Sequence, residues 1–308
     1  MKRILVVAAV IRREGRILIA QRPHDKHMGG LWEFPGGKVE PGEPAAVALV
    51  RELDEELGII ATGFRPLIRI THDYPDKAVC LEVWEVAAFS GEPHGREGQA
   101  VRWVTEAELP AFDYPAANRP IVTAARLPAR YLISPADLDE AGYVAWVEAA
   151  LARGARLLLL RAPALRAACY VALAQACLGR CRAAGARLLL HGDPALLEQV
   201  AADGVHLPAA RLAALSTRPD MGACWLSASV HDRQELALAE RLGVDFVTLS
   251  PVQATPSHPG QPGMGWEAFA AQVAQARVPV FALGGMREDD LERAWAAGAQ
   301  GIAGIRGL

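Results

Sequence analysis

Aromatic residues are scarce in this chain of 308 residues, and a basic surplus is missing. Aromatic residues make up 6% of the sequence, and 32 Lys and Arg stand against 35 Asp and Glu, which gives a net charge of -3. Proteins that bind duplex DNA or RNA usually carry a basic surplus or a basic run. The longest basic runs, 12–13 and 180–182, are short, so direct binding of nucleic acid is not expected.

Cysteine usage excludes a disulfide framework. The 5 cysteines include no Cys-x-x-Cys pair. Cys177 and Cys181 stand one helical turn apart, a spacing that could suit a metal ion, but no His neighbours them at ligand spacing. We therefore interpret them as small buried hydrophobic residues.

Long apolar runs are absent as well. No apolar run reaches the ~18 residues of a membrane span without a charge, Gly or Pro. Residues 1–11 resemble the start of a signal peptide, but they are few and lead directly into residues 12–16, Arg-Arg-Glu-Gly-Arg, without a good cleavage site. A buried first strand that enters a turn fits better. We expect a cytoplasmic protein without membrane contact.

The length of the chain and a change in the pattern of predicted strands and helices indicate two domains, 1–128 and 129–308. Pro128 cannot continue a helical hydrogen-bond ladder, so it ends a short predicted helix at 122–127. Strand-like runs around one strong helix predict an α+β fold for the first domain. The predicted strands are 3–12, 17–21, 78–89 and 100–104, and the predicted helix is 43–57.

Short apolar strands alternate with helical stretches from residue 131 onward. Strands without a polar face indicate a parallel sheet buried on both sides, and eight of them predict an α/β barrel of the TIM type. The predicted strands are 131–134, 156–161, 187–191, 204–207, 224–229, 245–250, 278–283 and 300–304.

Leu308 follows the last predicted strand so closely that the eighth outer helix is expected to be absent. The apolar flank that this leaves would be covered by the N-terminal domain or by another subunit. A homo-oligomer through this flank is therefore an expectation, and analytical ultracentrifugation that shows a free monomer would remove it.

Residues 37–59 carry the strongest chemical signal, G-x5-E-x7-R-E-U-x-E-E-x-G-U, where U is bulky aliphatic. Glu52, Glu55 and Glu56 stand at i, i+3 and i+4, so a helix projects the three carboxylates from one face. Divalent cations best explain such a cluster, and hard oxygen ligands favour Mg²⁺ or Mn²⁺. Merely solvated glutamates are the alternative, but the joint spacing of Gly, Arg and Glu argues against it.

Neighbouring residues support a site around this helix. Gly36 and Gly37 permit a turn that would strain other residues, and they bring a backbone carbonyl close to a ligand. Arg51 and Glu55 stand one turn apart, so we expect the arginine to hold that carboxylate in place.

The segment matches the signature of the Nudix hydrolases, and the likeness extends over the whole first domain, which particularly resembles the MutT type, the 8-oxo-dGTP diphosphatases. Supporting segments are 31–38, 74–77, 91–93, 95–99 and 115–120. This resemblance implies an enzyme that hydrolyses dNTP to dNMP and pyrophosphate, with water attacking the β-phosphorus. Its role would be to remove oxidised dGTP from the nucleotide pool.

The resemblance also implies a metal site. The matching ligands are carboxylates and a backbone carbonyl: Glu52, Glu55, Glu56, Glu97, and Gly36 or Gly37. One carboxylate, first Glu52 and second Glu97, would activate the water, and Arg51 belongs to the same catalytic group. Metal-bound water is a better nucleophile at neutral pH, and cations neutralise charge on the phosphate oxygens.

Substrate contacts follow from the same likeness. Arg22 and Lys38 are candidates to hold phosphates, although Lys38 is equally plausible as a solvated turn residue. For the base, the resemblance points to Asn118, whose amide offers a donor and an acceptor, and to the backbone near Phe34.

Three aromatic residues, Trp32, Phe34 and Tyr74, either pack on the purine or serve the core. Lys77 stands where the family has arginine, and lysine cannot reproduce the planar fork of a guanidinium group. Another dNTP or a nucleoside diphosphate derivative therefore stays open as the substrate.

The second domain resembles the thiamine phosphate synthase and TenI superfamily. The matching segments are 204–207, 227–231, 250–252, 255–257 and 282–286. Gly284, Gly285 and Gly304 stand where such barrels bind phosphate through backbone N–H groups, with tight turns as the alternative. His206 and His231 lie at strand ends and are either catalytic or hydrogen-bonded structural residues.

Several groups of the synthase are missing. The chain keeps Arg161 after the second barrel strand without a lysine beyond it, and it has His191-Gly192 after the third, where Asn-Asp is expected. No acidic ligand is evident beyond the fourth strand, and His258 stands near the position of a substrate-binding lysine. Departure of pyrophosphate would lose its electrostatic support, so thiamine phosphate synthesis is not expected.

Two further functions remain as alternatives. A Nudix fold could serve only to bind an oxidised base, but a binding module has no need of all four carboxylates. A thiamine-related barrel enzyme could carry a regulatory Nudix domain, but the missing barrel ligands argue against it.

Overall fold

The computed structural model describes residues 3–23, 28–255, 260 and 262–308. Contacts within the chain divide it into two units, Met1–Arg126 and Leu127–Leu308, against the predicted limits 1–128 and 129–308. Each unit is described by itself.

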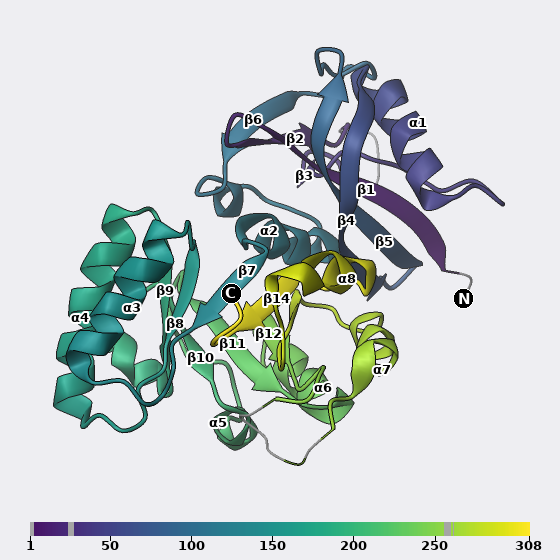
Figure 1. Cartoon of the computed structure of the whole chain (residues 1–308). Coiled ribbons are helices and arrows are strands. Elements are labelled where there is room, and N and C mark those ends of the chain that lie inside the picture. The colour runs from purple at the N-terminus through teal and green to yellow at the C-terminus, as the bar shows by residue number, and fades with distance from the viewer. Residues whose placement is uncertain (1–2, 24–27, 256–259, 261) are drawn as a thin grey trace. The chain divides into compact units, whose positions relative to one another are not determined.

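The first unit is built on a six-stranded mixed sheet (Figure 1). Its elements, in chain order, are β1 (Ile4–Arg13), β2 (Arg16–Gln21), β3 (Trp32–Glu33), α1 (Ala45–Leu57), β4 (Ile60–Asp73), β5 (Ala78–Ser90), β6 (Val101–Thr105), η1 (Leu109–Ala111), η2 (Ala116–Asn118) and α2 (Arg119–Arg126). The strand order is β3-β2-β1-β5-β4, and β6 pairs with β2. β1 and β5 are parallel, whereas the other pairs are antiparallel. The predicted α+β class is confirmed.

β1 explains why the sheet has a helix on each face. Val7, Ala9 and Ile11 pack in one cluster with the apolar residues of α1, and Ala8 and Val10 pack in another with those of α2. Side chains of a strand alternate between the two faces. The continuous apolar run of β1 is therefore buried on both sides, as predicted for a buried first strand.

The sequence pattern does not predict β4, the longest strand of this unit. Gly63 and Pro66 lie inside it, and both residues are unfavourable within a strand. The fold accepts them because β4 lies at the edge of the sheet, and because its pairing with β5 shifts register between Ala61 and Gly63 and between Pro66 and Ile68. Such bulges accommodate residues that break the regular ladder.

α1 begins at Ala45, two residues later than predicted, and α2 begins at Arg119 rather than at 122. Glu43 lies outside α1 and accepts a hydrogen bond from the Glu40 amide at 3.0 Å. Gly58 ends α1 in the left-handed region, with φ of 70°. One face of the helix is buried: Ala48, Leu49, Leu53 and Leu57.

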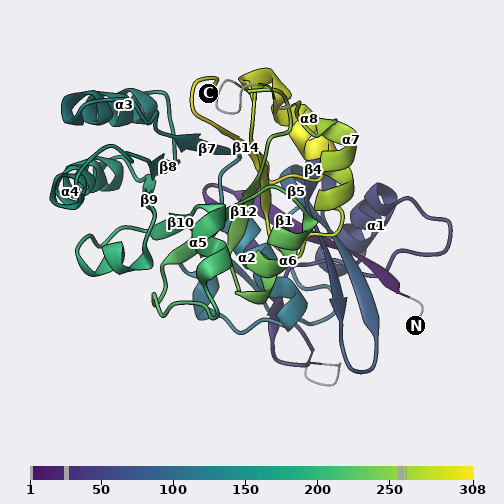
Figure 2. The same cartoon turned by 90° about the horizontal axis from the view of Figure 1, so that it is seen from below.

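Parallel strands close a barrel in the second unit, and its helices lie outside the strands (Figure 2). The elements are β7 (Arg130–Ile133), α3 (Glu140–Ala152), β8 (Leu157–Leu160), α4 (Ala167–Ala183), β9 (Arg187–His191), η3 (Pro194–Glu198), β10 (Gly204–Leu207), α5 (Ala209–Ala214), β11 (Trp225–Val230), α6 (Arg233–Arg241), β12 (Phe246–Leu249), α7 (Gly265–Val273), β13 (Val280–Ala282), η4 (Glu288–Asp290), α8 (Leu291–Ala296) and β14 (Gly301–Gly304). The strands follow chain order, and β14 pairs with β7. The predicted α/β barrel is confirmed.

Aromatic rings fill the barrel interior. Tyr131, Phe246 and Phe281 contact one another with ring centroids 5.6 to 5.7 Å apart. Alternate residues of the same strands pack outward against the helices. Cys177 and Cys181 are fully buried in α4 with free thiols, as predicted.

The last described residues, 305–308, follow β14 without forming a helix. Among the described helices, none combines the length and the apolar character that a membrane span requires.

Candidate active site

The loop between β3 and α1 runs against β1. The Val7 amide donates to the Gly37 carbonyl at 2.9 Å. Gly36 has a φ of +146°, and a Cβ at this position would lie 2.2 Å from the Val7 carbonyl oxygen. A Cβ on Gly37 would lie 2.0 Å from Glu52 Oε2. Gly36 is therefore required by the close approach of the β1 backbone, whereas a side chain at Gly37 would displace the carboxylate of Glu52.

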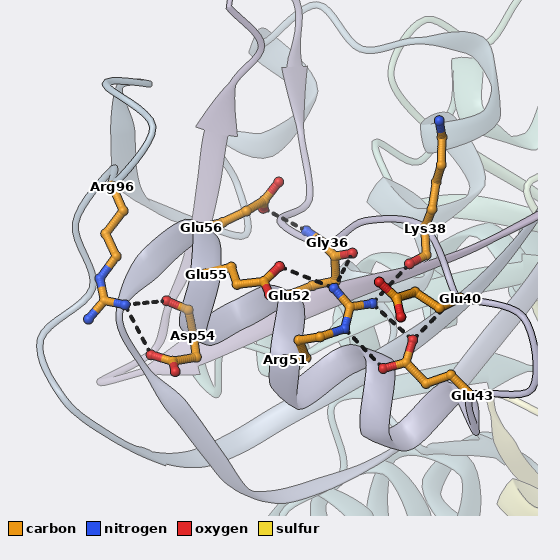
Figure 3. Close-up of polar contacts among 10 residues, drawn as sticks. All are labelled: Gly36, Lys38, Glu40, Glu43, Arg51, Glu52, Asp54, Glu55, Glu56 and Arg96. Carbon is orange, nitrogen blue, oxygen red and sulfur yellow. Dashed lines mark hydrogen bonds and ion pairs between the residues drawn. The ribbon is translucent and has the colours of Figure 1, made fainter.

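Arg51 lies among three carboxylates (Figure 3). Its Nε and Nη2 atoms donate to the two Glu43 oxygens at 2.9 Å, and its Nη1 atom donates to Glu52 at 2.9 Å and to Glu55 at 3.1 Å. Nη2 also donates to the Lys38 carbonyl at 3.1 Å. A two-point contact fixes the plane of the guanidinium group. Arg51 thus orients Glu52, makes the expected contact with Glu55, and joins α1 to the glycine loop.

Glu56 lies apart from the Arg51 cluster and contacts the glycine loop (Figure 3). The Gly36 amide donates to Glu56 Oε2 at 3.0 Å. Burial, and then the charges of Glu33, Glu52 and Glu97, raise the pKa of Glu56 to about 8, against the opposing effect of the Gly36 amide. Without a cation, Glu56 is therefore largely protonated at neutral pH.

A cavity of about 590 Å³ lies beside Glu56, within the size range of small-molecule sites. Its lining combines opposite charges: the carboxylates Glu33, Glu56 and Glu97, and the cations Arg22, Lys38 and Lys77. Apolar residues of β1 and β5 complete the wall: Ile4, Val6, Val79 and Leu81. A molecule with a polyanionic part and a flat apolar part suits this lining.

The residues expected to contact a base line the same cavity: Phe34, Tyr74, Lys77 and Asn118. The Tyr74 amide donates to the Lys77 carbonyl at 2.8 Å, and the Lys77 ammonium lies 5.7 Å from the centroid of the Tyr74 ring. Tyr74 Oη accepts a hydrogen bond from the Ala117 amide at 3.4 Å. The segment between β4 and β5 is thus brought next to η2.

Trp32 does not belong to the cavity lining; its ring packs edge-on against Phe112 at 5.2 Å. Phe34 is 3% exposed and stacks on Tyr114 at 5.8 Å. Trp32 therefore has the core role that was one of its two interpretations, whereas Phe34 packs in the core and also lines the cavity.

In the part of the chain that the structure describes, no three His, Cys, Asp or Glu side chains are arranged to hold a metal ion. Glu52 and Glu55 contact Arg51 instead and are not among the cavity-lining residues. Glu56 and Glu97 nevertheless fit a divalent cation, because both carboxylates line the cavity and burial raises the pKa of Glu56. A bound cation would offset the repulsion between the carboxylates and the cost of burying their charge.

Two residues of the site have no role in the sequence analysis. Glu33 forms an ion pair with Arg22, and both line the cavity. Gln99 donates to the Glu56 carbonyl at 3.1 Å and accepts from the Glu97 amide at 2.9 Å, so it holds the loop of Glu97 near the end of α1. No spacing along the chain marks these residues, because their partners lie on other segments.

The glycines of the predicted barrel phosphate site are closely packed. Gly284 and Gly285 follow β13 with φ of 101° and 71°, and a Cβ on Gly284 would lie 2.8 Å from the Cα of Pro251. A Cβ on Gly304 would lie 2.9 Å from Cγ of Leu308. Packing alone accounts for these glycines, and phosphate binding stays a prediction. Residues 256–258, which complete the matching segment and include His258, lie outside the described residues.

His206 is buried inside the barrel among hydroxyl groups. Its Nδ1 atom lies 2.7 Å from Ser227 Oγ and 3.3 Å from Tyr131 Oη, and its Nε2 atom lies 2.8 Å from Ser229 Oγ. Burial, helped by the neighbouring His191, lowers the pKa of His206 to about 3. A neutral imidazole with both nitrogens bonded favours the structural role over that of a base.

His231 follows β11, and its Nδ1 atom lies 2.9 Å from Glu235 Oε2. A second cavity of about 230 Å³ lies beyond β8 and β9, with Tyr170 and His191 as its polar lining residues. Burial, and then the charge of Arg161, lower the pKa of His191 to about 4. The lining of this cavity contains neither carboxylate nor lysine.

Two family models match the chain. Residues 6–124 match the NUDIX domain, and residues 130–308, more than half of the chain, match the model described as thiamine monophosphate synthase. The chain therefore belongs to the NUDIX family in its first part and to the thiamine monophosphate synthase family in its second part. Nudix hydrolases in general need a divalent metal.

Named relatives cover both parts. An 8-oxo-dGTP diphosphatase of Escherichia coli (strain K12) is 41% identical over 40% of this chain and 95% of its own length. A CTP pyrophosphohydrolase of the same organism is 44% identical over 44% of this chain and 100% of its own length. A putative thiamine-phosphate synthase of Geobacter sulfurreducens is 39% identical over 58% of this chain and 85% of its own length. The chain is an enzyme, a Nudix hydrolase.

Proposed function

We propose that residues 1–128 form a Mg²⁺-dependent diphosphatase that hydrolyses 8-oxo-dGTP to 8-oxo-dGMP and pyrophosphate. The observation that carries this proposal is the single cavity lined by carboxylates, by cations and by base-contacting residues. The 41% identity to an 8-oxo-dGTP diphosphatase supports the choice of substrate. Such an activity removes an oxidised nucleotide from the pool before it causes mutations.

In this proposal, the metal ligands are carboxylates and one backbone carbonyl: Glu52, Glu55, Glu56, Glu97 and Gly36. Gly36 is favoured over Gly37, because the Gly37 carbonyl already accepts a hydrogen bond from the Val7 amide. When bound, Mg²⁺ (or Mn²⁺) would neutralise phosphate charge and would make the attacking water more acidic.

Side chains of the protein transfer the proton and hold the substrate in the proposed reaction. Glu52, oriented by Arg51, accepts a proton from the water whose oxygen attacks the β-phosphorus. The bond from the β-phosphorus to the α,β-bridging oxygen breaks, so 8-oxo-dGMP is the leaving group and the oxygen of the attacking water becomes part of pyrophosphate. Arg22 and Lys38 hold the phosphate chain, and the Asn118 amide pairs with the edge of the purine.

The test is a comparison of kcat/KM for 8-oxo-dGTP, dGTP, CTP and the other dNTPs with Mg²⁺, with products identified by chromatography. We expect a large preference for 8-oxo-dGTP, with release of 8-oxo-dGMP and pyrophosphate. Absence of turnover on every nucleoside triphosphate would refute the proposal.

A pyrimidine nucleoside triphosphate is the second candidate substrate. A CTP pyrophosphohydrolase is 44% identical, and Lys77 lines the cavity where the MutT type has arginine. A kcat/KM for CTP above that for 8-oxo-dGTP would decide for this alternative.

Asn118→Ala is expected to lower the preference for 8-oxo-dGTP over dGTP by roughly tenfold, with a smaller effect on kcat. The reason is that lost pairing with the base edge costs about 1–3 kcal/mol of discrimination, while the carboxylates of the site stay in place. Steady-state kinetics on both nucleotides measure the ratio. Equal losses on the two substrates would contradict this role of Asn118.

For the barrel, we propose that it does not make thiamine phosphate. The cavity beyond β8 and β9 is lined by apolar residues with Tyr170 and His191, without the charged groups that pyrophosphate and its metal need. We expect that the full chain does not restore growth of a strain without thiamine phosphate synthase on medium without thiamine. Restored growth would show that the barrel is an active synthase.

A further inference from the structure

We propose that Glu33 is a positioning residue of the Nudix reaction, which holds the guanidinium group of Arg22 toward the phosphate chain of the substrate. This inference rests on the proposed diphosphatase function. It concerns a pair of residues outside the signature segment 37–59.

Strand pairing brings the two residues together. Ala20 pairs with Glu33 and Gln21 pairs with Trp32 in the β2–β3 ladder, so Arg22 follows directly after the paired end of β2. The backbone of Arg22 is held as well, because its amide donates to the Leu31 carbonyl at 2.9 Å and its carbonyl accepts from the Gly30 amide at 3.0 Å. Hydrogen bonds on both sides therefore fix the backbone position of Arg22.

The side chains then fix the direction of the guanidinium group. Arg22 Nη1 donates to Glu33 Oε2, and each side chain is 25% exposed. A guanidinium group carries its N–H donors in one rigid plane, so a carboxylate that holds one nitrogen also sets where the others point. Both residues line the cavity that Glu56, Glu97 and Lys38 line.

The negative charge of Glu33 also helps to raise the pKa of Glu56. Its charge acts on Glu56 more strongly than the charges of Glu52 and Glu97 do. This nearness allows a second reading, in which Glu33 binds the cation directly. The ion pair favours positioning, because Arg22 already engages the carboxylate oxygen.

The experiment compares Glu33→Ala, Arg22→Ala and the double variant in the full chain, on 8-oxo-dGTP over a series of Mg²⁺ concentrations. If Glu33 acts through Arg22, both single variants raise KM by roughly tenfold, with a smaller change in kcat. The double variant is then no worse than Arg22→Ala alone, because both substitutions remove the same interaction. Half-saturation by Mg²⁺ stays unchanged in all three.

The matched control is Glu92→Ala. Glu92 pairs with Arg13 at 2.8 Å in the same unit, but it is 75% exposed and does not line the cavity. Its loss should leave KM and kcat unchanged. Thermal melting of each variant shows whether the fold is kept, and Glu33→Asp should recover part of the lost affinity.

Three results would overturn the inference: an unchanged KM in Glu33→Ala, additive losses in the double variant, or a shift in Mg²⁺ half-saturation at constant KM. The last result would make Glu33 a metal ligand. If the wild-type chain turns over no nucleoside triphosphate, the proposed function fails separately. Calorimetry with the α,β-methylene analogue of dGTP then still tests the pair, because Glu33→Ala should weaken its binding by the same factor.

Discussion

Glu52→Gln should lower kcat on 8-oxo-dGTP by about 10²- to 10⁴-fold, while KM changes only a few-fold. The amide has the same shape, so its oxygen can still accept the hydrogen bond that Arg51 donates at 2.9 Å and still fits beside Gly37. It loses the capacity to take a proton from water and part of its affinity for Mg²⁺, and saturating Mg²⁺ offsets the second loss. Steady-state kinetics at saturating Mg²⁺ measure the effect on the chemical step.

The control for this assignment is Glu97→Gln, since Glu97 is the second candidate for the base. Glu97 lines the cavity, whereas Glu52 lies behind Gly37 and contacts Arg51. If the Glu97 variant loses more kcat than the Glu52 variant under the same conditions, Glu97 is the base and our assignment is wrong. A rise in KM alone would place either residue in substrate binding.

Much of the barrel could be predicted because parallel strands buried on both faces need unbroken apolar runs. β8 is such a run, with Leu157 to Leu160 all buried. The same reasoning fails for β4, in which Gly63 and Pro66 interrupt the pattern. Their place on an edge strand with shifted register is a property of the whole sheet, and no local pattern reports it.

The site shows the same division between local and distant contacts. Helical spacing predicted that Arg51 would contact Glu55, because residues at i and i+4 are neighbours on a helix. It did not predict that Glu52 and Glu56, which are also one turn apart, bind different partners. Glu52 contacts Arg51 and Glu56 contacts the Gly36 amide, which comes from a loop that only folding brings to the helix.

Distant pairing likewise explains why Glu33 escaped notice. Its partner Arg22 follows directly after β2, and their approach depends on the register of the β2–β3 ladder. A short strand of two residues carries no periodic signal of its own. Motif spacing therefore identified the residues of α1 and the resemblance pointed to Arg22, whereas the pairing of Arg22 with Glu33 needed the structure.

Glu56→Gln should remove nearly all turnover and, in the absence of metal, stabilise the first unit. The pKa of Glu56 is about 8 in the folded protein, against about 4.3 in an unfolded chain. Between these values the folded state keeps a proton that the unfolded chain has released. The free energy of unfolding of the metal-free first unit is therefore undiminished below about pH 4.3, and it falls as the pH rises toward 8.

Glutamine does not titrate and can still accept the hydrogen bond from the Gly36 amide, so the variant escapes this loss. We expect its advantage to reach on the order of 2–4 kcal/mol above pH 8 in the presence of EDTA. Hydrogen exchange of peptides from residues 36–57, measured by mass spectrometry at pH 6 and pH 9 after correction for intrinsic exchange rates, reads this unit separately from the barrel.

With Mg²⁺ present, the wild type should become the more strongly protected of the two proteins, and Glu56→Gln the less protected. The carboxylate of the wild type binds the cation and slows exchange in residues 36–57, whereas the amide of the variant is a poorer ligand, and turnover drops by at least about 10²-fold. If both proteins lose protection equally between pH 6 and pH 9, Glu56 does not carry the raised pKa. If Mg²⁺ protects both equally, Glu56 is not a metal ligand.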